Sequence, residues 1–294
     1  MHGCSNAESK LLGVQRRLTL GSTVSSVARA AASTMTLQYF LSRGLIRSSD
    51  AAEVSWCHGV NSRSGLMEAL SGSAHMMEAD VLMRECDPKE PIMAHPPARD
   101  SDITLKEWLQ EVKEQQKGIK LDFKSLEAVA PSLVLLEEVL AKTNLPVWIN
   151  ADVLAGPGGH AQPLDPQAFL SAVRDLPPHV VLSLGWTTGW TAGMDNPGYS
   201  WDMVRVMEGV CRALQHPVTF PVRAVLLARS APQLRWLLQQ SHRYTLTVWT
   251  GQTDTLTPQD LLPYRRGFDR SRVYYDLPPS LRTELNRGTQ DGDV

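Results

Sequence analysis

The sequence of 294 residues has few cysteines, no strong excess of either charge and no long hydrophobic run, and each shortage excludes a class of protein. Its four cysteines are scattered without a CxxC spacing, which argues against a disulfide framework and against a structural zinc site. A net charge of -2 without a basic stripe gives no reason to expect a nucleic acid as partner. No apolar run approaches the length of a transmembrane span. The chain also lacks an Asn-x-Ser/Thr acceptor, so we expect an intracellular protein, most simply a cytoplasmic one.

The first 34 residues differ in composition from the rest. They are rich in Ser, Ala, Thr and Arg, and Glu8 is their only acid, as in mitochondrial transit peptides. The simpler interpretation is a disordered or spuriously included leader, because Met35 could itself start a compact chain. Residues 35–294 are then expected to form one domain with a short disordered tail from about residue 284, and a mitochondrial location follows only if residues 1–34 are a transit peptide.

From Ser55 onward, short β-branched and apolar runs alternate with stretches of helical periodicity. Leu105, Trp108 and Val112 mark one amphipathic helix, for which Thr104 and Glu107 form a capping box. The predicted strands are Val54–Val60, Met76–Leu82, Ile119–Phe123, Val147–Ala151, Val180–Leu184, Val222–Leu227, Leu246–Trp249 and Val273–Tyr275. The other main helical stretches are Leu126–Ala141, Pro166–Val173, Trp201–Leu214, Ala231–Gln240 and Pro258–Tyr264. A shorter piece, Pro91–Ala94, is an extra strand or part of a loop.

Alternating strands and helices are typical of a parallel α/β sheet. With one strand in roughly 30 residues, closure into a (β/α)8 TIM-type barrel is more natural than an open doubly wound sheet. No GxGxxG follows the first strand, which removes the commonest reason to prefer the open sheet. In such a barrel the reactive side chains lie at the carboxyl ends of the strands, so these ends are where chemistry is expected.

Acidic residues recur with a spacing of two on the predicted strands. Glu78 and Asp80 therefore point to one face, where their charges repel and lose hydration unless a cation lies between them. Oxygen ligands favour Mg²⁺ or Ca²⁺, with Mn²⁺ a further candidate, and a salt-bridged pair is the equal alternative. Lys120, Asp122 and Lys124 share the inward face of the next long strand, which makes Asp122 a candidate third ligand and Lys124 an anion-binding group. A self-contained network of Lys, Asp and Lys is the alternative there.

Two histidines and several other polar groups come at or near successive strand ends. His58 closes the first strand, and two prolines restrict the backbone after His95. We expect both histidines to serve as acid and base, and Lys124 to act beside them. The residues expected to contact a substrate are Asn61, Lys120, Asn150 and Trp249. Taken together these groups fit the cleavage of a phosphodiester, in which a cation and a lysine neutralise phosphate charge.

Four segments resemble the PLC-like phosphodiesterase superfamily, which includes the glycerophosphodiester phosphodiesterases and the spider-venom sphingomyelinases D; they are His58–Asn61, Glu78–Val81, Ala94–His95 and Lys120–Lys124. The resemblance implies metal ligands at Glu78, Asp80 and Asp122 and an acid–base pair at His58 and His95. The chain departs from the glycerophosphodiesterase pattern in having Gly-Val after the first histidine and Asp rather than Glu as third carboxylate.

The chain is still more similar to the menorin family, and to its short paralogue without a membrane anchor. The segments that resemble the family are Trp56–His58, Ala74–Leu82, Pro91–Pro97, Gly118–Ser125, Val147–Asp152 and Leu184–Trp190. They span the region from about Leu37 to Asp276, nearly all of the expected domain.

Three functions compete on this basis. The first is a metal-dependent phosphodiesterase, a hydrolase or a phospholipase-D-like lyase, acting on a small phosphodiester or a phospholipid-like substrate. The second is a non-catalytic barrel that binds a phosphorylated ligand or a protein partner. A glycosidase fits less well, because Glu78 and Asp80 lie on one wall whereas glycosidase acids flank the scissile bond. We therefore expect an enzyme of the first kind, with the binding module as the alternative.

Overall fold

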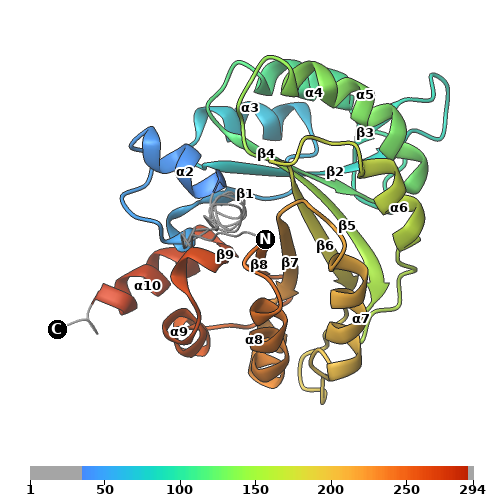
Figure 1. Cartoon of the computed structure of the whole chain (residues 1–294). Helices are drawn as coiled ribbons and strands as arrows, with labels where there is room; N and C mark the ends of the chain where they lie inside the picture. The colour runs from blue at the N-terminus through green and yellow to red at the C-terminus, as the bar shows by residue number, and fades with distance from the viewer. Residues whose placement is uncertain (1–34, 291–294) are drawn as a thin grey trace, which may run out of the picture.

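The computed structural model describes residues 35–290, so the predicted leader (residues 1–34) and the last four residues lie outside it (Figure 1). The strands are β1 (Trp56–Cys57), β2 (Met76–Met83), β3 (Pro91–Met93), β4 (Gly118–Phe123), β5 (Val147–Ala155), β6 (Val181–Thr187), β7 (Val218–Arg223), β8 (Tyr244–Trp249) and β9 (Val273–Asp276). The helices are α2 (Met35–Ser42), α3 (Arg63–Ser71), α4 (Leu105–Val112), α5 (Val129–Leu140), α6 (Pro166–Val173), α7 (Trp201–Cys211), α8 (Ala231–Gln239), α9 (Pro258–Gly267) and α10 (Pro279–Gln290).

Eight of the strands form a parallel sheet in the order β1-β2-β4-β5-β6-β7-β8-β9, with helices around its outside (Figure 1). The predicted (β/α)8 TIM-type barrel is confirmed, although within residues 35–290 no backbone ladder joins β1 to β9 and the barrel is nearly closed rather than closed. The short β3 is an added strand, antiparallel to β2, so the segment after Pro91 is strand and not loop. The capping box of Thr104 and Glu107 at the start of α4 is confirmed as well.

An aromatic layer fills the interior toward the amino-terminal ends of the strands. Trp148 of β5 packs edge-on against Trp56 of β1 and Tyr274 of β9, with ring centroids 5.1 and 4.9 Å apart. Its indole Nε1 donates a hydrogen bond to Thr36 Oγ1 of α2 at 3.0 Å. Because alternate residues of a strand share a face, the residues two and four positions later on these strands also point inward. They lie closer to the carboxyl ends of the strands than the aromatic layer does.

Three expectations about element boundaries are wrong. The predicted strand Val222–Leu227 begins earlier, because β7 starts at Val218 and the chain turns into a 3-10 helix, η3 (Ala224–Arg229), after Arg223. The apolar run reflects burial of that turn rather than extended chain. The first strand is shorter than predicted, because Gly59 adopts a positive φ of 69° directly after it. The disordered tail expected from residue 284 is instead helical as far as residue 290, and Leu285 of α10 is fully buried.

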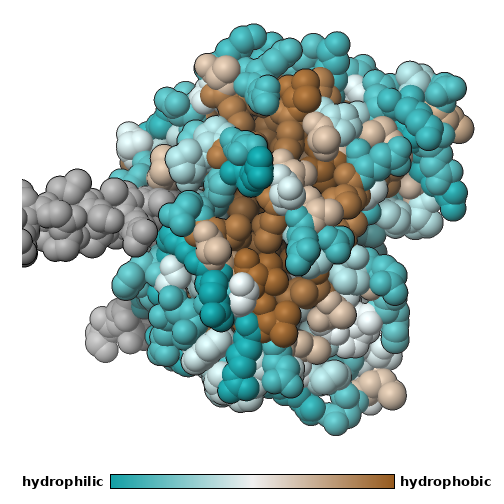
Figure 2. Space-filling view, turned by 45° about the vertical axis from the view of Figure 1, so that its right-hand side comes forward, coloured by the Kyte–Doolittle hydropathy of each residue, from teal (hydrophilic) through white to brown (hydrophobic). Residues whose placement is uncertain are grey.

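The outside of the barrel carries exposed hydrophobic side chains. Figure 2 shows hydrophobic residues gathered into a band across one face of the molecule. On α5, Val134 is 65% exposed and lines a groove with Leu176, which follows α6. Among the described residues, no helix is both long enough and apolar enough to cross a membrane.

Candidate functional site

The register of the sheet gathers the predicted acidic residues in one row. Asp80 of β2 is paired with Asp122 of β4, and Asp122 with Asn150 of β5. Two residues earlier on the same strands, Glu78 is paired with Lys120. Neighbouring strands are only about 4.7–4.9 Å apart, so paired residues on the inward face come into side-chain contact.

The three predicted metal ligands are brought together by this register. One carboxylate oxygen from each of Glu78, Asp80 and Asp122 lies within 4.8 Å of the other two. Glu78 is 1% exposed, and burial raises the pKa of its carboxyl, as do the charges of Asp80 and Asp122. The positive charge of His58 opposes this rise. The group is thus a convergent set of carboxylate oxygens, of which Glu78 and Asp80 are buried and Asp122 is partly buried.

Neutral donors hold these carboxylates in place. The backbone N–H of Gly59 donates to Glu78 Oε2 at 2.9 Å. Asn61 Nδ2 donates to Asp80 Oδ2 at 2.6 Å, while Asn61 Oδ1 accepts from the Asp80 backbone N–H at 2.8 Å. Asn150 Nδ2 donates to Asp122 Oδ1 at 2.6 Å. The two asparagines are predicted to contact substrate, and in the structure they orient the acids. Both the nitrogen and the oxygen of the Asn61 side-chain amide are already engaged by Asp80.

The two lysines of β4 and its continuation differ in their surroundings. Lys124 Nζ lies 2.7 Å from Asp122 Oδ2 and 3.0 Å from Asp80 Oδ1. Burial alone would lower the pKa of Lys124, but these carboxylates raise it above its usual value, so the amine is charged. Burial likewise favours a high pKa for Asp122, yet Lys124, Lys120 and the hydrogen bonds bring it down to about 2. Lys120 is 4% exposed and makes no hydrogen bond or ion pair with any described residue, so its amine is available to a ligand.

His58 lies across the open seam of the barrel. Its Nδ1 is 2.8 Å from Asp276 Oδ2, at the end of β9, and 3.5 Å from Glu78 Oε2. The charge of Glu78 raises the pKa of His58 to about 9; burial opposes this, and the hydrogen bond to Asp276 adds to it. With Nδ1 engaged, Nε2 is the nitrogen left for a ligand, and the side chain is 55% exposed. No local sequence signal predicts this pairing, because Asp276 is 218 residues away from His58.

His95 is on the loop between β3 and α4. It is exposed, its Nδ1 lies 2.6 Å from the carbonyl oxygen of Pro96, and it lines the same cavity as His58. The loop is tied to β2 where the Ala94 N–H donates to the Asp80 carbonyl at 3.0 Å. The structure therefore brings the two predicted histidines to one cavity, and their roles as acid and base stay a prediction.

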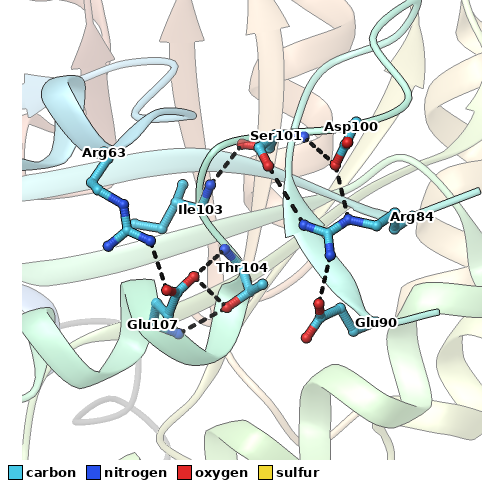
Figure 3. Close-up of polar contacts among 8 residues, drawn as sticks. All are labelled: Arg63, Arg84, Glu90, Asp100, Ser101, Ile103, Thr104 and Glu107. Atoms are coloured by element: carbon cyan, nitrogen blue, oxygen red, sulfur yellow. Dashed lines mark hydrogen bonds and ion pairs between the residues drawn. The ribbon is translucent and has the colours of Figure 1, made fainter. Parts of the chain in front are cut away.

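Further along, a network of charges holds this loop in shape (Figure 3). Arg84 donates to Glu90 Oε1 at 2.6 Å and to Asp100 Oδ1 at 2.8 Å (Figure 3). Its guanidinium therefore joins the segment before β3 to the segment after it. Arg63 Nη2 donates to Glu107 Oε1 at 2.6 Å, linking α3 to the start of α4 (Figure 3). Both contacts restrict where the segment that carries His95 can lie.

These groups surround a cavity of about 350 Å³ at the carboxyl ends of the strands, which we call the bowl. Its lining residues are His58, Asp80, His95, Lys120, Asp122, Lys124, Asn150, Asp152, Ala161, Thr187, Thr188, Pro221 and Trp249. Trp249, a predicted substrate contact, is thus on the wall, with the Arg223 guanidinium 5.5 Å from its ring centroid. A second cavity of about 560 Å³ lies on the other side of His58, along the β1–β9 seam.

The balance of charge in and around the bowl tests whether a metal ion fits. Five carboxyl groups face two lysines and one histidine, so two negative charges remain when all are ionised; the acids are Glu78, Asp80, Asp122, Asp152 and Asp276. A divalent cation supplies that charge, and carboxylate oxygens are what Mg²⁺, Ca²⁺ and Mn²⁺ prefer. The residues present therefore fit a hard divalent ion.

Comparison with known proteins adds a family and a set of folds. A family model described as the Menorin N-terminal domain matches residues 50–282. The human Protein FAM151B is 51% identical over 243 residues, which cover 82% of this chain and 88% of that protein. Among solved structures, a glycerophosphoryl diester phosphodiesterase from Parabacteroides distasonis is similar with 12% identity and a TM-score of 0.47, over 80% of this chain and 86% of the other. A dihydropteroate synthetase is similar with 9% identity and a TM-score of 0.43, over 81% of this chain and 94% of the other. Likeness at this level does not distinguish one barrel chemistry from another.

Proposed function

The chain belongs to the menorin family, and on that premise we propose that it is a metal-dependent phosphodiesterase, either a hydrolase or a phospholipase-D-like lyase. The observation that carries the proposal is the convergence of Glu78, Asp80 and Asp122 with His58 only 3.5 Å from the first of them. Lys124 offsets part of the repulsion between Asp80 and Asp122, and a divalent ion would balance the charge that remains on the three carboxylates. A histidine beside them supplies proton transfer. The substrate would be a small phosphodiester or a phospholipid-like one.

Glu78, Asp80 and Asp122 would hold the divalent ion, Mg²⁺, Ca²⁺ or Mn²⁺. Bound there, the ion would neutralise charge that develops on a phosphoryl oxygen in the transition state. Asn61 and Asn150 keep the carboxylates aimed inward, so little reorganisation is needed when a ligand enters.

The two histidines divide the proton transfers. Water, or a neighbouring hydroxyl of the substrate, attacks phosphorus and loses its proton to one imidazole. The bond from phosphorus to the leaving oxygen breaks, and the other imidazole protonates that oxygen. Asp276 holds His58 through Nδ1, which presents Nε2 to the bowl. His95 approaches from the β3 side, on a loop that Arg84 fixes.

The lysines act on charge in two ways. Lys124 bridges Asp80 and Asp122, so its main contribution is to keep two like-charged ligands close together. Lys120 has no such partner among the described residues and is nearly buried in the wall of the bowl. An anionic phosphate oxygen would satisfy it, because a buried charge without a partner is costly.

The test is turnover of a phosphodiester panel by the full chain with Mg²⁺, Ca²⁺ or Mn²⁺, and with chelator. His58→Ala and His95→Ala are each expected to lower turnover by about 10²- to 10⁴-fold while the fold persists. His242→Ala is the matched control, since His242 is an exposed histidine that does not line the bowl. Unchanged turnover in either bowl variant would refute the catalytic assignment. Binding without turnover under every metal would favour the binding module.

A separate proposal concerns location in the cell and rests on the sequence alone. A cytoplasmic enzyme is expected, or a mitochondrial one if residues 1–34 act as a transit peptide. Imaging of the full chain and of a chain lacking residues 1–34 tests this, because only a transit peptide makes the two patterns differ.

A further inference from the structure

One carboxyl group of the bowl takes no part in the metal cluster or in holding the histidines. Asp152 lies on β5 two residues beyond Asn150, so it shares the inward face and lines the bowl. It is partly buried, and burial together with the charge of Asp122 raises the pKa of its carboxyl to about 7. Within the part of the chain that the structure describes, this carboxyl has no hydrogen bond and no ion pair.

The sheet makes room for this carboxyl by omitting a side chain. The β6 residue paired with Asp152 is Gly185, and a Cβ built there would collide with Asp152 Oδ1. The same Cβ would lie 2.9 Å from Pro221 Cγ on β7. Glycine inside a strand weakens the strand and often marks a place where another group approaches closely. Here the approaching group is the Asp152 carboxylate, held in a notch between three strands.

An acid in such a notch lacks what stabilises the other acids of the site. Asp80 and Asp122 have Lys124, and Glu78 has the Gly59 N–H and His58. Lys120 and Lys124 lower the pKa of Asp152 only from beyond ion-pair distance. The Asp152 carboxyl is partly exposed in the unbound protein, so a ligand that covers it without supplying a donor would leave it buried and unpaired, at a cost in free energy.

The surroundings of Asp152 place it against the organic part of a substrate. Its strand, β5, is next to the β4 strand of Asp122 and three strands from β1, and its carboxyl faces Gly185 of β6 and Pro221 of β7. A phosphate bound through a divalent ion at Glu78, Asp80 and Asp122 would therefore be able to extend one of its two ester groups toward Asp152.

We propose that Asp152 is a specificity-determining residue, which accepts a hydrogen bond from a hydroxyl or ammonium group on the alcohol portion of the substrate. The inference rests on the proposed phosphodiesterase function and names a feature of its substrate: a donor group close to the phosphate. An ester whose alcohol lacks such a donor would leave the Asp152 carboxyl buried and unpaired in the complex, which is the strongest way for a site to reject an analogue.

The experiment uses three matched esters of 4-nitrophenyl phosphate: propyl, 3-hydroxypropyl and 3-aminopropyl. Dissociation constants are measured by calorimetry, and kcat/KM by nitrophenol release, with Mn²⁺ present throughout. The full chain is expected to prefer one or both donor-bearing esters over the propyl ester by about 10- to 100-fold in both quantities. The hydroxyl and ammonium esters distinguish the two donors.

Asp152→Leu is expected to bring that preference to about onefold, while binding of the propyl ester changes little or improves. Asp152→Asn keeps an acceptor oxygen in nearly the same volume and should retain part of the preference for the hydroxyl ester. Asp175→Asn, which removes an exposed acid after α6, is the control and should change nothing. Thermal unfolding reports on the fold: a residue with a structural partner would lose stability as Asn, whereas Asp152→Asn should unfold at the same temperature or higher.

The outcomes separate this inference from the function on which it rests. A donor preference in the dissociation constants without any turnover would overturn the phosphodiesterase and leave the role of Asp152 standing. Turnover without a donor preference, or a preference that survives in Asp152→Leu, would overturn the role of Asp152 and leave the phosphodiesterase. If none of the three esters binds, the inference is also wrong.

Discussion

Removal of Lys124 is the perturbation whose result the structure predicts in most detail. In Lys124→Met the amine that lies 2.7 Å from Asp122 and 3.0 Å from Asp80 is replaced by an apolar chain of similar length. The side chains of Asp80 and Asp122 are only 7% and 14% exposed, so their charges then repel with little screening by water. Breaking a buried pair on one side typically costs 3–5 kcal/mol, and the partial exposure of Lys124 favours the lower end, about 3 kcal/mol. For a domain of this size that is a fall in Tm of about 6–12 °C.

The assay is thermal unfolding followed by circular dichroism, in chelator and at saturating Mg²⁺ or Ca²⁺. A ligand at 100 times its Kd stabilises the folded state by about 2.7 kcal/mol, so the cation should stabilise the wild type and should restore much of the loss in Lys124→Met. Lys106→Met on the exposed face of α4 is the control. If Lys124→Met unfolds at the wild-type temperature in chelator, the two acids do not depend on Lys124. If the cation stabilises Asp80→Asn and Asp122→Asn as much as the wild type, it binds elsewhere.

Three further predictions address positioning. Asp276→Asn should lower kcat by about 10- to 100-fold with little change in KM, because His58 loses the carboxylate that orients its ring. Asp276→Asn added to His58→Ala should lower kcat no further, and additive losses of kcat would contradict the pairing of the two residues. Gly185→Ala should lower stability by about 1–3 kcal/mol through its collision with Asp152, as measured by urea unfolding. The same change in an Asp152→Ala background should cost less, and equal costs would show that the Asp152 carboxyl is not what Gly185 accommodates. Arg84→Met should free the loop that carries His95 and lower turnover by about tenfold while nearby Arg99→Met, an exposed ion pair with Glu85, leaves it unchanged.

Much of the fold and the identity of the acidic residues follow from local sequence patterns. The alternation of strands and helices predicts a barrel, and the spacing of two within Glu78 and Asp80 places both carboxylates on one face. These features depend only on the period of a strand or a helix, which neighbouring residues determine. The same local reasoning misplaced β7, because the apolar run from Val222 to Leu227 does not distinguish an extended strand from a buried 3-10 turn.

Only the tertiary structure decided which residues face one another. The register that pairs Asp80 with Asp122, and the hydrogen bond between His58 and Asp276 across the seam, join residues 42 and 218 positions apart. The notch that Gly185 leaves for Asp152 likewise depends on how two strands align. Such contacts arise from packing of the whole barrel, and a one-residue slip of any strand would turn these side chains away from the bowl. The sequence by itself therefore determined what kinds of groups line the inward face, and the closure of the sheet decided which of them act together.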